Sequence, residues 1–152
     1  MPTSHAGPPL EAPGLDDAIG ALRSRGLRVS AARRLVLEAI YATERPISAE
    51  EVAGGLDGRL PRSDPASVYR NLETLEKIGL VRHFHLGHGP GRYVRAGDAR
   101  EFLVCDSCGE VRVLEGHTLE AIRAVLRRDL GYEAEFTHFP IVGLCAGCHE
   151  DG

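Results

Sequence analysis

Residues 64–81, DPASVYRNLETLEKIGLV, decide the fold of the first half of this chain. They predict a helix that begins at Asp64-Pro65, because proline is favoured in the first turn of a helix. Apolar residues recur at i, i+4, i+7 and i+10 and form one stripe, namely Val68, Leu72, Leu75 and Ile78. The opposite side is polar and carries Tyr69, Arg70, Asn71, Glu73 and Thr74. The helix therefore has one face for a core and another face for a partner.

Three further helices are predicted upstream of this stretch. The first covers residues 15–25 and stops at Gly26, a suitable C-terminal cap. Ser30 caps the second, residues 30–42. Its inner face is expected to consist of Leu35, Val36, Ala39 and Ile40. A capping box, Ser48 with Glu51, opens the third over residues 48–56.

Two strands are predicted downstream, over residues 80–85 (LVRHFH) and 91–95 (GRYVR), around a turn rich in glycine and proline. Helices followed by a short glycine-tipped hairpin are typical of a winged helix-turn-helix, whose last helix enters the major groove of DNA. Side chains on this helix that suit contacts to base edges and phosphates are Ser67, Tyr69, Arg70 and Asn71. A small helical bundle with an exposed polar face has the same pattern and is the alternative interpretation.

The second half of the chain predicts a small α+β unit. Its elements are a strand over 101–105, a strand over 110–115, a helix over 118–130 and a last strand over 133–145. The helix ends at Gly131, and its inward residues are expected to be Leu119, Ile122, Val125, Leu126 and Leu130. A unit of this size has little core of its own, so it is expected to need a metal, a partner chain or both.

All four cysteines lie in two Cys-x-x-Cys pairs, Cys105 with Cys108 and Cys145 with Cys148. Each pair places two thiolates on one side of a tight turn, and two pairs complete the tetrahedral cage that structural Zn²⁺ favours. Such a site supplies on the order of 10 kcal/mol to the folding of a small unit. Disulfides, which are rare in the cytoplasm, a thiol redox switch and an iron–sulfur cluster are the competing interpretations.

Composition and charge describe a folded chain of 152 residues with a net charge of −4. Residues 15–95 hold thirteen Arg/Lys against ten Asp/Glu, whereas residues 96–152 hold five against eleven. A basic part suits contact with a polyanion, although charge scattered over solvated faces gives a similar count. Residues 1–14, rich in Pro, Gly and Ala, predict a disordered tail.

Several classes are disfavoured by what the sequence does not contain. There is no apolar run of membrane length and no signal-peptide pattern at the start, so we expect a cytoplasmic protein that makes no membrane contact. No paired catalytic acids, phosphate-binding glycine loop or nucleophile–base pair stands out, and a four-thiolate zinc has no open coordination position. The sequence therefore does not predict an enzyme.

The winged helix with SVYRNLETLEKIGLV (67–81), the strand with LVCDSCGEV (103–111) and GLCAGC (143–148) together resemble the ferric uptake regulator (Fur) family. The resemblance implies a homodimeric, metal-responsive transcription repressor. Residues 15–95 would bind a palindromic operator in double-stranded DNA, and residues 96–152 would dimerise. It also implies structural zinc on the two cysteine pairs and a second, exchangeable metal near the junction. Tyr69 and Arg70 are then candidates for DNA contact, with Arg33 and Arg34 as further backbone contacts.

The usual sensing ligands of that family do not all carry over to this chain. Arg100 and Phe102 stand where metal-binding histidines are expected, and the turn at residues 45–48 (RPIS) offers no ligand. By resemblance, the remaining ligands are Glu101, Glu120 and His138. To complete a site we expect His83 and His85, which share one face of a strand, and Asp98 in the linker. Some zinc-uptake regulators of the family also lack the histidine run.

The leading hypothesis is therefore a metal-dependent repressor whose regulatory metal bridges the hairpin, the linker (95–101) and the dimer domain. Zn²⁺ accepts histidine nitrogen and carboxylate oxygen in a tetrahedral shell, and Fe²⁺ or Mn²⁺ does so in a larger one. The alternative is a peroxide-responsive or redox-responsive regulator of the same fold, which uses the cysteines or a histidine-bound iron.

Overall fold

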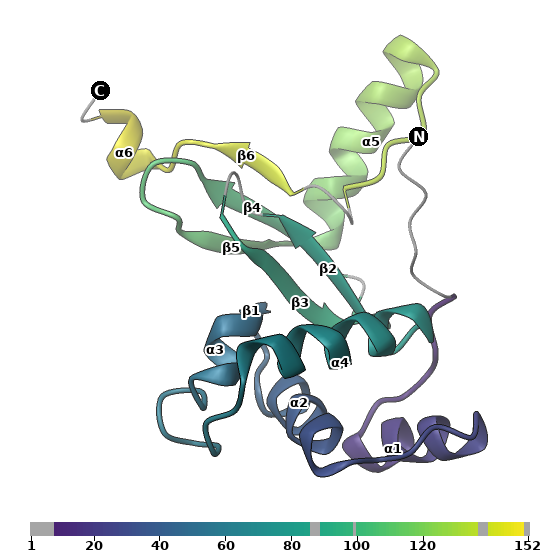
Figure 1. Ribbon diagram of the computed structural model, residues 1–152. Coiled ribbons are helices and arrows are strands. Elements are labelled where there is room, and N and C mark those ends of the chain that lie inside the picture. The colour runs from purple at the N-terminus through teal and green to yellow at the C-terminus, as the bar shows by residue number, and fades with distance from the viewer. Residues whose placement is uncertain (1–7, 86–88, 99, 137–139, 151–152) are drawn as a thin grey trace. The chain divides into compact units, whose positions relative to one another are not determined.

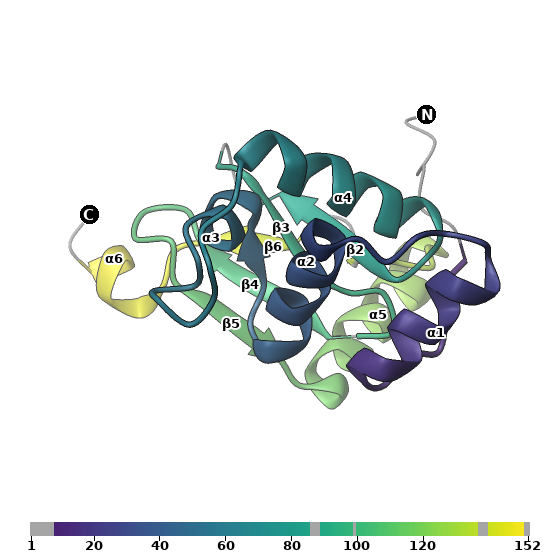
Figure 2. The same ribbon diagram turned by 60° about the horizontal axis from the view of Figure 1, so that its bottom comes forward.

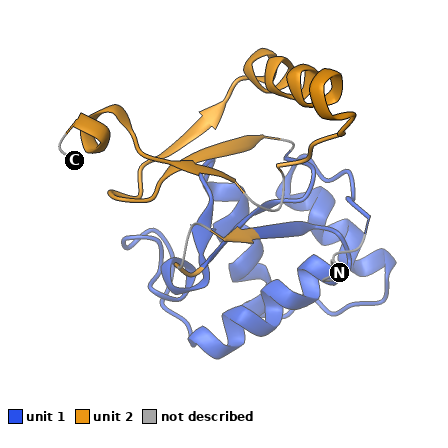
Figure 3. Ribbon diagram, turned by 90° about the horizontal axis from the view of Figure 1, so that it is seen from above, with its two compact units in different colours: residues 1–83, 91–98 blue, residues 84–90, 99–152 orange. Residues whose placement is uncertain are grey.

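The computed structural model describes residues 8–85, 89–98, 100–136 and 140–150. The chain divides into two compact units, of which unit 1 comprises residues 1–83 and 91–98 and unit 2 comprises residues 84–90 and 99–152 (Figure 3). The sequence predicts a domain boundary between residues 95 and 96. The units change over after Asp98, and the segment 84–90 groups with unit 2.

Helices and a small sheet make up unit 1 (Figure 1). In the described residues its elements are α1 (Leu15–Ser24), α2 (Ala31–Ala42), β1 (Ile47–Ser48), α3 (Ala49–Ala53), α4 (Pro65–Lys77), β2 (Val81–His85) and β3 (Gly91–Arg95). The last two residues of β2 belong to unit 2. The strands form a sheet in the order β1-β3-β2, and β1 pairs antiparallel with β3 so that Ile47 lies opposite Tyr93. This is the predicted winged helix-turn-helix.

Local hydrogen bonds explain where three of these helices begin. The Ser30 hydroxyl accepts from the backbone N–H of Arg33 at the start of α2 over 3.2 Å. At α3 the Ser48 hydroxyl accepts from the N–H of Glu51 over 3.1 Å, and the Glu51 carboxylate accepts from the N–H of Ser48 over 2.8 Å. At α4 the Asp64 carboxylate accepts from the N–H of Ser67 over 3.0 Å. Each cap satisfies an amide that the first turn leaves without a partner.

The core of unit 1 lies where α1, α2, α3, α4 and the sheet meet. Its fully buried side chains include Leu22, Leu37, Ile47, Leu72 and Leu75. The views of Figures 1 and 2 agree that α2 and α4 lie side by side.

The buried faces of two helices differ from the predicted ones. In α2 Leu37 is buried and Leu35 only half-buried, because α2 packs against α1, α4 and β3 and so buries a broader face than one stripe. In α4 Asn71, expected on the polar side, is 9% exposed and lies against α2.

Residues 8–13, expected to belong to a disordered tail, pack against unit 1. The N–H of Leu10 donates to the carbonyl of Gly79 over 2.9 Å, and the Tyr41 hydroxyl donates to the carbonyl of Ala12 over 2.7 Å. Leu10 and Ala12 are partly buried against the core. Apolar contact and these two bonds compensate for the entropy of ordering the segment. Residues 1–7 lie outside the described part of the chain.

Unit 2 contains a three-stranded sheet and α5. Its elements in the described residues are β4 (Glu101–Cys105), β5 (Val111–Leu114), α5 (Gly116–Leu130), β6 (Ile141–Gly143) and α6 (Ala146–Glu150). The sheet order is β5-β4-β6. β4 pairs antiparallel with β5 and parallel with β6, which places Cys105 opposite Gly143. This is the predicted small α+β unit.

The last predicted strand is much shorter than residues 133–145. Only Ile141–Gly143 is a strand, residues 133–136 are not, and residues 137–139 lie outside the described residues. Arginines of α5 hold the segment before it. Arg127 forms a two-pronged ion pair with Glu133, and Arg123 donates to the carbonyl of Ala134 over 3.0 Å. These contacts keep residues 133–134 on the helix rather than on the sheet.

The apolar stripe of α5 is mostly exposed within one chain, against expectation. Leu119 is buried, but Ile122 is 36%, Val125 45% and Leu130 71% exposed. One small sheet does not cover the helix. Apolar side chains of β5 and of the segment 142–144 are exposed as well: Val111, Val113, Val142 and Leu144. Unit 2 thus leaves apolar surface for a partner.

Within the described residues no helix has both the length and the apolar character that crossing a membrane requires.

Candidate metal and DNA-binding sites

The four cysteines meet at one end of the unit 2 sheet. Cys105 ends β4 and Cys108 follows it in a tight turn, while Cys145 immediately precedes α6 and Cys148 lies within it. The parallel pairing of β4 with β6 brings the two turns together. All four sulfur atoms lie within 4.8 Å of one another, and the thiols are free. The structure thus gathers the residues that the spacing predicts.

The sulfur geometry fits a tetrahedral metal. A Zn–S bond of about 2.3 Å implies sulfur atoms about 3.8 Å apart at the corners of a tetrahedron. The Sγ atoms of Cys108 and Cys145 are 3.8 Å apart. The Cys105 sulfur also accepts the backbone N–H groups of Cys145 over 3.3 Å and of Cys108 over 3.5 Å. Such N–H···S bonds orient a ligating sulfur and stabilise its negative charge.

The acidity of the thiols also favours a cation. The backbone N–H groups of Cys108 and Cys145 lower the pKa of the Cys105 thiol to about 6. For Cys145, the backbone N–H of Cys148 lowers the pKa, but hydrogen bonding to the thiols of Cys148 and Cys105 raises it to about 12. Cys105 therefore ionises more readily than Cys145, whose thiol is held protonated by its hydrogen bonds to neighbouring sulfur atoms. A divalent metal that binds all four sulfur atoms favours their thiolate forms.

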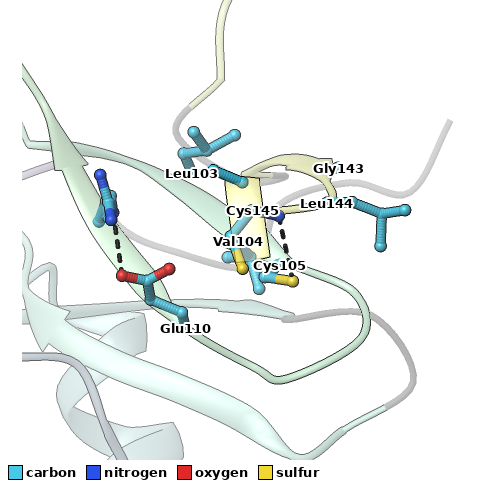
Figure 4. A pocket seen from close by; sticks show the side chains of 9 residues that line it. Leu103, Val104, Cys105, Glu110, Gly143, Leu144 and Cys145 are labelled. Carbon is cyan, nitrogen blue, oxygen red and sulfur yellow. Dashed lines mark hydrogen bonds and ion pairs between the residues drawn. The ribbon is translucent and has the colours of Figure 1, made fainter. Parts of the chain in front are cut away.

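A small cavity lies beside the cysteine cage (Figure 4). Its lining includes Leu103, Val104, Glu110 and Leu144 together with Cys105 and Cys145. Its volume of about 120 Å³ is below the roughly 300–1,000 Å³ of small-molecule sites. The four-thiolate cage is closed and has no ligand position left for a substrate. The geometry therefore suits a structural metal.

Glu101, a predicted regulatory ligand, is already engaged by a cation of the protein. Its side chain is 7% exposed, and Oε1 forms an ion pair with Arg123 of α5. The guanidinium also lies 5.7 Å from the centre of the Phe136 ring. The second oxygen, Oε2, is buried and has no hydrogen-bond partner among the residues that the structure describes. Only this oxygen remains for a metal.

The other predicted regulatory ligands are distributed over both units. In unit 1, Nδ1 of His83 lies 2.5 Å from Oε1 of Glu76, which raises the pKa of the histidine. In unit 2, His85 is exposed and Glu120 lies 3.6 Å from Arg127. The backbone carbonyl of Asp98, in unit 1, accepts from Arg82 over 2.8 Å.

His138 lies outside the described residues. Among the described residues the four cysteines are the one group of three or more His, Cys, Asp or Glu side chains placed to hold a metal. The regulatory site of His83, His85, Asp98, Glu101, Glu120 and His138 therefore stays a prediction.

The predicted DNA-contact residues lie on α2 and α4 of unit 1. Tyr69 is 42% exposed, Arg70 is exposed and Ser67 is half-buried. Tyr69 donates its hydroxyl to Oε1 of Glu50 on α3 over 2.5 Å. Arg34 is exposed and pairs with Glu38 over 3.1 Å.

Arg33 is held by two partners within unit 1. Its Nε donates to Oδ1 of Asn71 over 3.1 Å, and Nη1 donates to the carbonyl of Arg28 over 2.8 Å. Asn71 also donates from Nδ2 to the carbonyl of Ser67 over 2.9 Å. With its amide used at both ends, Asn71 supports Arg33 and does not face outward.

Sequence reasoning missed three partners that the fold supplies: Glu50 for Tyr69, Glu76 for His83 and Arg123 for Glu101. These contacts join residues 19, 7 and 22 positions apart. No local pattern connects such positions. Only the packing of α3 on α4, of β2 beside α4 and of α5 beside β4 reveals them.

A winged helix-turn-helix unit and a four-thiolate α+β unit in one chain define a class of DNA-binding regulator with a metal-stabilised second unit. The profile of the Ferric uptake regulator family (FUR) matches residues 24–139. The chain belongs to this family, and the resemblance stated from the sequence is confirmed.

Named relatives agree with this assignment. The chain is 24% identical over 136 residues to the peroxide-responsive repressor PerR of Staphylococcus saprophyticus, covering 90% of this chain and 92% of that protein. A structure of the Vibrio cholerae ferric uptake regulator (Fur) is 26% identical with a TM-score of 0.66, covering 83% of this chain and 98% of the other. The Helicobacter pylori Fur structure, reported to reveal three functional metal-binding sites, has a TM-score of 0.70 at 19% identity. The match covers 90% of this chain and 94% of the other.

Proposed function

We propose that this protein is a homodimeric, metal-dependent repressor that binds a palindromic operator and controls metal uptake or homeostasis genes in the cytoplasm. The observation that carries the proposal is the combination, in one family member, of an outward-facing polar face on α4 and a four-thiolate cage. Unit 1 reads DNA, and unit 2 assembles the dimer. Regulators of this kind do not need a reactive centre, so we assign no enzymatic role.

α4 is the DNA-reading helix of this proposal. Tyr69 and Arg70 are exposed on it, and Ser67 lies in its first turn. Arg33 and Arg34, in the first turn of α2, are assigned contacts to phosphates. Arg70→Ala is expected to weaken binding to a duplex that the wild-type protein selects from a random pool. Fluorescence anisotropy measures this effect, with Arg128→Ala in unit 2 as the matched loss of charge. Equal affinities of the two variants would contradict the assignment of α4.

Structural Zn²⁺ is assigned to Cys105, Cys108, Cys145 and Cys148. When bound, the metal neutralises the thiolates and links the end of β4 to the segment after β6. The residues provide four sulfur atoms within 4.8 Å of one another, with one pair 3.8 Å apart, and the N–H donors that orient Cys105. Their role is to hold the fold of unit 2 together.

The regulatory metal, Zn²⁺, Fe²⁺ or Mn²⁺, is assigned to His83, His85, Asp98, Glu101, Glu120 and His138. The buried Oε2 of Glu101, which has no hydrogen-bond partner within the described part of the chain, supports a cation at this position. Arg123 occupies the other oxygen, so Glu101 is expected to ligate through one atom. Metal and DNA then favour the same conformation, and each raises the affinity for the other.

One titration tests the sensing function. Operator affinity is measured on the full chain with its four-cysteine zinc retained, with and without added Zn²⁺, Mn²⁺ or Fe²⁺. We expect at least one metal to tighten binding. A His83→Ala/His85→Ala variant should lose that response and keep its zinc, as measured by metal analysis. Equal operator affinity with every metal and without metal would contradict the proposed metal sensing.

Dimerisation is assigned to the apolar surface of unit 2. Val125 on α5 is 45% exposed in the single chain. Val125→Glu places a charge in the proposed interface and is expected to convert the dimer to a monomer, as measured by light scattering at equal concentration. Ala32→Glu adds the same charge to the exposed start of α2, and this variant should still have the molar mass of a dimer. A dimeric Val125→Glu variant would place the interface elsewhere.

A second candidate function is a peroxide-responsive repressor. The observation that favours it is the similarity to the peroxide-responsive repressor PerR of Staphylococcus saprophyticus over most of both chains. It predicts that hydrogen peroxide abolishes operator binding by the metal-loaded protein and that a thiol reductant restores it. Operator binding that is unchanged after peroxide treatment would exclude this second candidate and leave the metal-responsive repressor as the proposed function.

A further inference from the structure

The exposed tyrosine of α4 is bound by a carboxylate of a neighbouring helix. The hydroxyl of Tyr69 donates to Oε1 of Glu50, the second residue of α3, over 2.5 Å. An O–H···O⁻ bond of this length is charge-assisted and stronger than a neutral one. The same bond lowers the pKa of Glu50 and raises that of Tyr69. Both residues lie on the outer surface of unit 1, so the bond forms although water is available to each.

The position of Glu50 is fixed by the way in which α3 begins. Ser48 and Glu51 close a capping box around the first turn, and Ala49 and Val52 are fully buried. α3 packs along α4. The buried face of α3 therefore fixes the backbone of Glu50, and the exposed side chain of Glu50 binds the Tyr69 hydroxyl. Neither residue depends on unit 2 for this contact.

The negative charge of Glu50 is unfavourable on a face that binds DNA. A carboxylate beside phosphates opposes association, because it repels the charge that the face must meet. Glu50 therefore has an unfavourable charge and a favourable bond at the same site. The two effects have opposite signs on DNA affinity, so an experiment separates them.

We infer that Glu50 is a positioning residue for DNA recognition. Its carboxylate holds the Tyr69 hydroxyl and fixes the ring in one orientation before DNA arrives. The inference rests on the proposed role of α4. A tyrosine that is already ordered does not lose side-chain freedom on binding. Ordering one side chain costs about 0.5–1.5 kcal/mol, which corresponds to about a two- to tenfold change in affinity.

The experiment compares substitutions at Glu50 in the zinc-loaded full chain. One probe is a duplex that the wild type selects from a random pool, and the other is a shuffled duplex of the same base composition. Glu50→Ala is expected to bind the selected duplex about two- to tenfold more weakly. Its affinity for the shuffled duplex should be unchanged or higher, because a negative charge is lost. Glu50→Gln keeps an oxygen that can accept a hydrogen bond from the Tyr69 hydroxyl. This variant should bind the selected duplex more tightly than Glu50→Ala does.

Two controls separate positioning from charge and from folding. Glu73→Ala removes one negative charge from α4, where Glu73 pairs with Lys77 over 3.2 Å, and leaves Tyr69 untouched. It should bind both duplexes at least as tightly as the wild type. In a Tyr69→Phe background, which lacks the hydroxyl, Glu50→Ala should cause no further loss. Circular dichroism confirms that each variant is folded.

The outcomes distinguish the inference from the function on which it rests. If Glu50→Ala tightens binding to both duplexes as Glu73→Ala does, charge is the whole effect and the inference fails. The inference also fails if Glu50→Ala weakens binding equally with Tyr69 and with phenylalanine at position 69. If Tyr69→Ala binds the selected duplex as the wild type does, the proposed role of α4 at this residue fails together with the inference.

Discussion

Asn71 lies at the contact between α2 and α4, and both ends of its side-chain amide are used. Oδ1 accepts from Nε of Arg33 over 3.1 Å, and Nδ2 donates to the carbonyl of Ser67 over 2.9 Å. The residue is 9% exposed, so water does not readily replace either bond. Asn71 therefore acts on the proposed DNA face indirectly, by fixing the guanidinium of Arg33.

Replacing this amide tests its structural weight. Asn71→Ala removes two hydrogen bonds and leaves the Ser67 carbonyl without its side-chain donor. Each lost bond of this kind costs about 1 kcal/mol, so we expect the free energy of unfolding to fall by roughly 1–3 kcal/mol in urea denaturation. Arg34→Ala breaks the exposed pair with Glu38 and should change stability by less than about 0.5 kcal/mol. Equal stability of the two variants would show that Asn71 is not a structural residue.

At the residue scale the sequence predicts what is local. Ser30 and Ser48 with Glu51 were recognisable as caps, because a cap joins residues two or three positions apart. The Cys-x-x-Cys pairs are local for the same reason. The partners of Tyr69 and Glu101 come from other elements. Which residues become these partners depends on the rotation of each helix about its axis and on the register of the strands. The periodicity of the sequence predicts both only to within about one residue.

At the scale of elements, Glu51 joins α3 to the sheet of unit 1. Its carboxylate accepts from the N–H of Ser48 over 2.8 Å, from Arg45 over 2.8 Å and from Arg92 of β3 over 2.9 Å. Burial raises the pKa of Glu51, but the Ser48 N–H and the two arginines outweigh burial and lower it. The carboxylate is therefore more stable in the folded state than in the unfolded chain.

This lowered pKa predicts how stability depends on pH. A group whose folded pKa is depressed contributes stability above its unfolded pKa, about 4.3 for glutamate, and loses it as the pH falls through the folded value. Glu51→Gln should therefore be less stable than the wild type at pH 7, by roughly 1 kcal/mol. The difference should shrink as the pH falls below about 4.3. A difference that stays constant down to pH 3 in urea titrations would contradict this account.

Arg123 joins β4, α5 and the segment after α5 within unit 2. Arg123→Ala leaves the Glu101 carboxylate buried without its cation, and breaking a buried pair on one side costs about 3–5 kcal/mol. Arg123 is itself 23% exposed, so we expect the lower end of this range. Thermal unfolding measures the effect. The double variant Glu101→Gln/Arg123→Ala removes the buried charge and should recover part of the loss. A single variant as stable as the wild type would mean that Glu101 has another counter-ion.

The segment after α5 shows why element boundaries in unit 2 were harder to predict than those in unit 1. Residues 133–136 alternate in polarity like a strand, yet Arg127 and Arg123 hold Glu133 and Ala134 beside the helix. Side-chain ion pairs of this kind override a weak strand pattern. By contrast, α4 combines a cap, a first-turn proline and an apolar stripe, and these agree on one answer.

At the scale of the whole molecule, the two units depend on different stabilising interactions. Unit 1 has a continuous core built from four helices and the sheet. In unit 2 the buried apolar side chains of the described residues are few: Phe84, Phe102, Val104, Cys105, Leu119 and Pro140. Phe84 and Phe102 stack with ring centres 5.0 Å apart. Much of α5 is exposed in the single chain, so we expect unit 2 to need a metal, a partner chain or both for its stability.

Zinc removal should therefore affect the two units unequally. A structural four-thiolate zinc contributes on the order of 10 kcal/mol, comparable with the whole stability of a small domain. In the full chain, chelation or Cys148→Ser should abolish hydrogen-exchange protection in β4, β5 and α5, while α2 and α4 keep theirs. Loss of protection in unit 2 should also dissociate the dimer and weaken operator binding, because two reading helices then no longer act together. Restored zinc should return protection to the wild-type chain but not to Cys148→Ser. Unchanged exchange in zinc-free unit 2 would mean that its apolar contacts suffice, and that the cage has a role other than holding the fold.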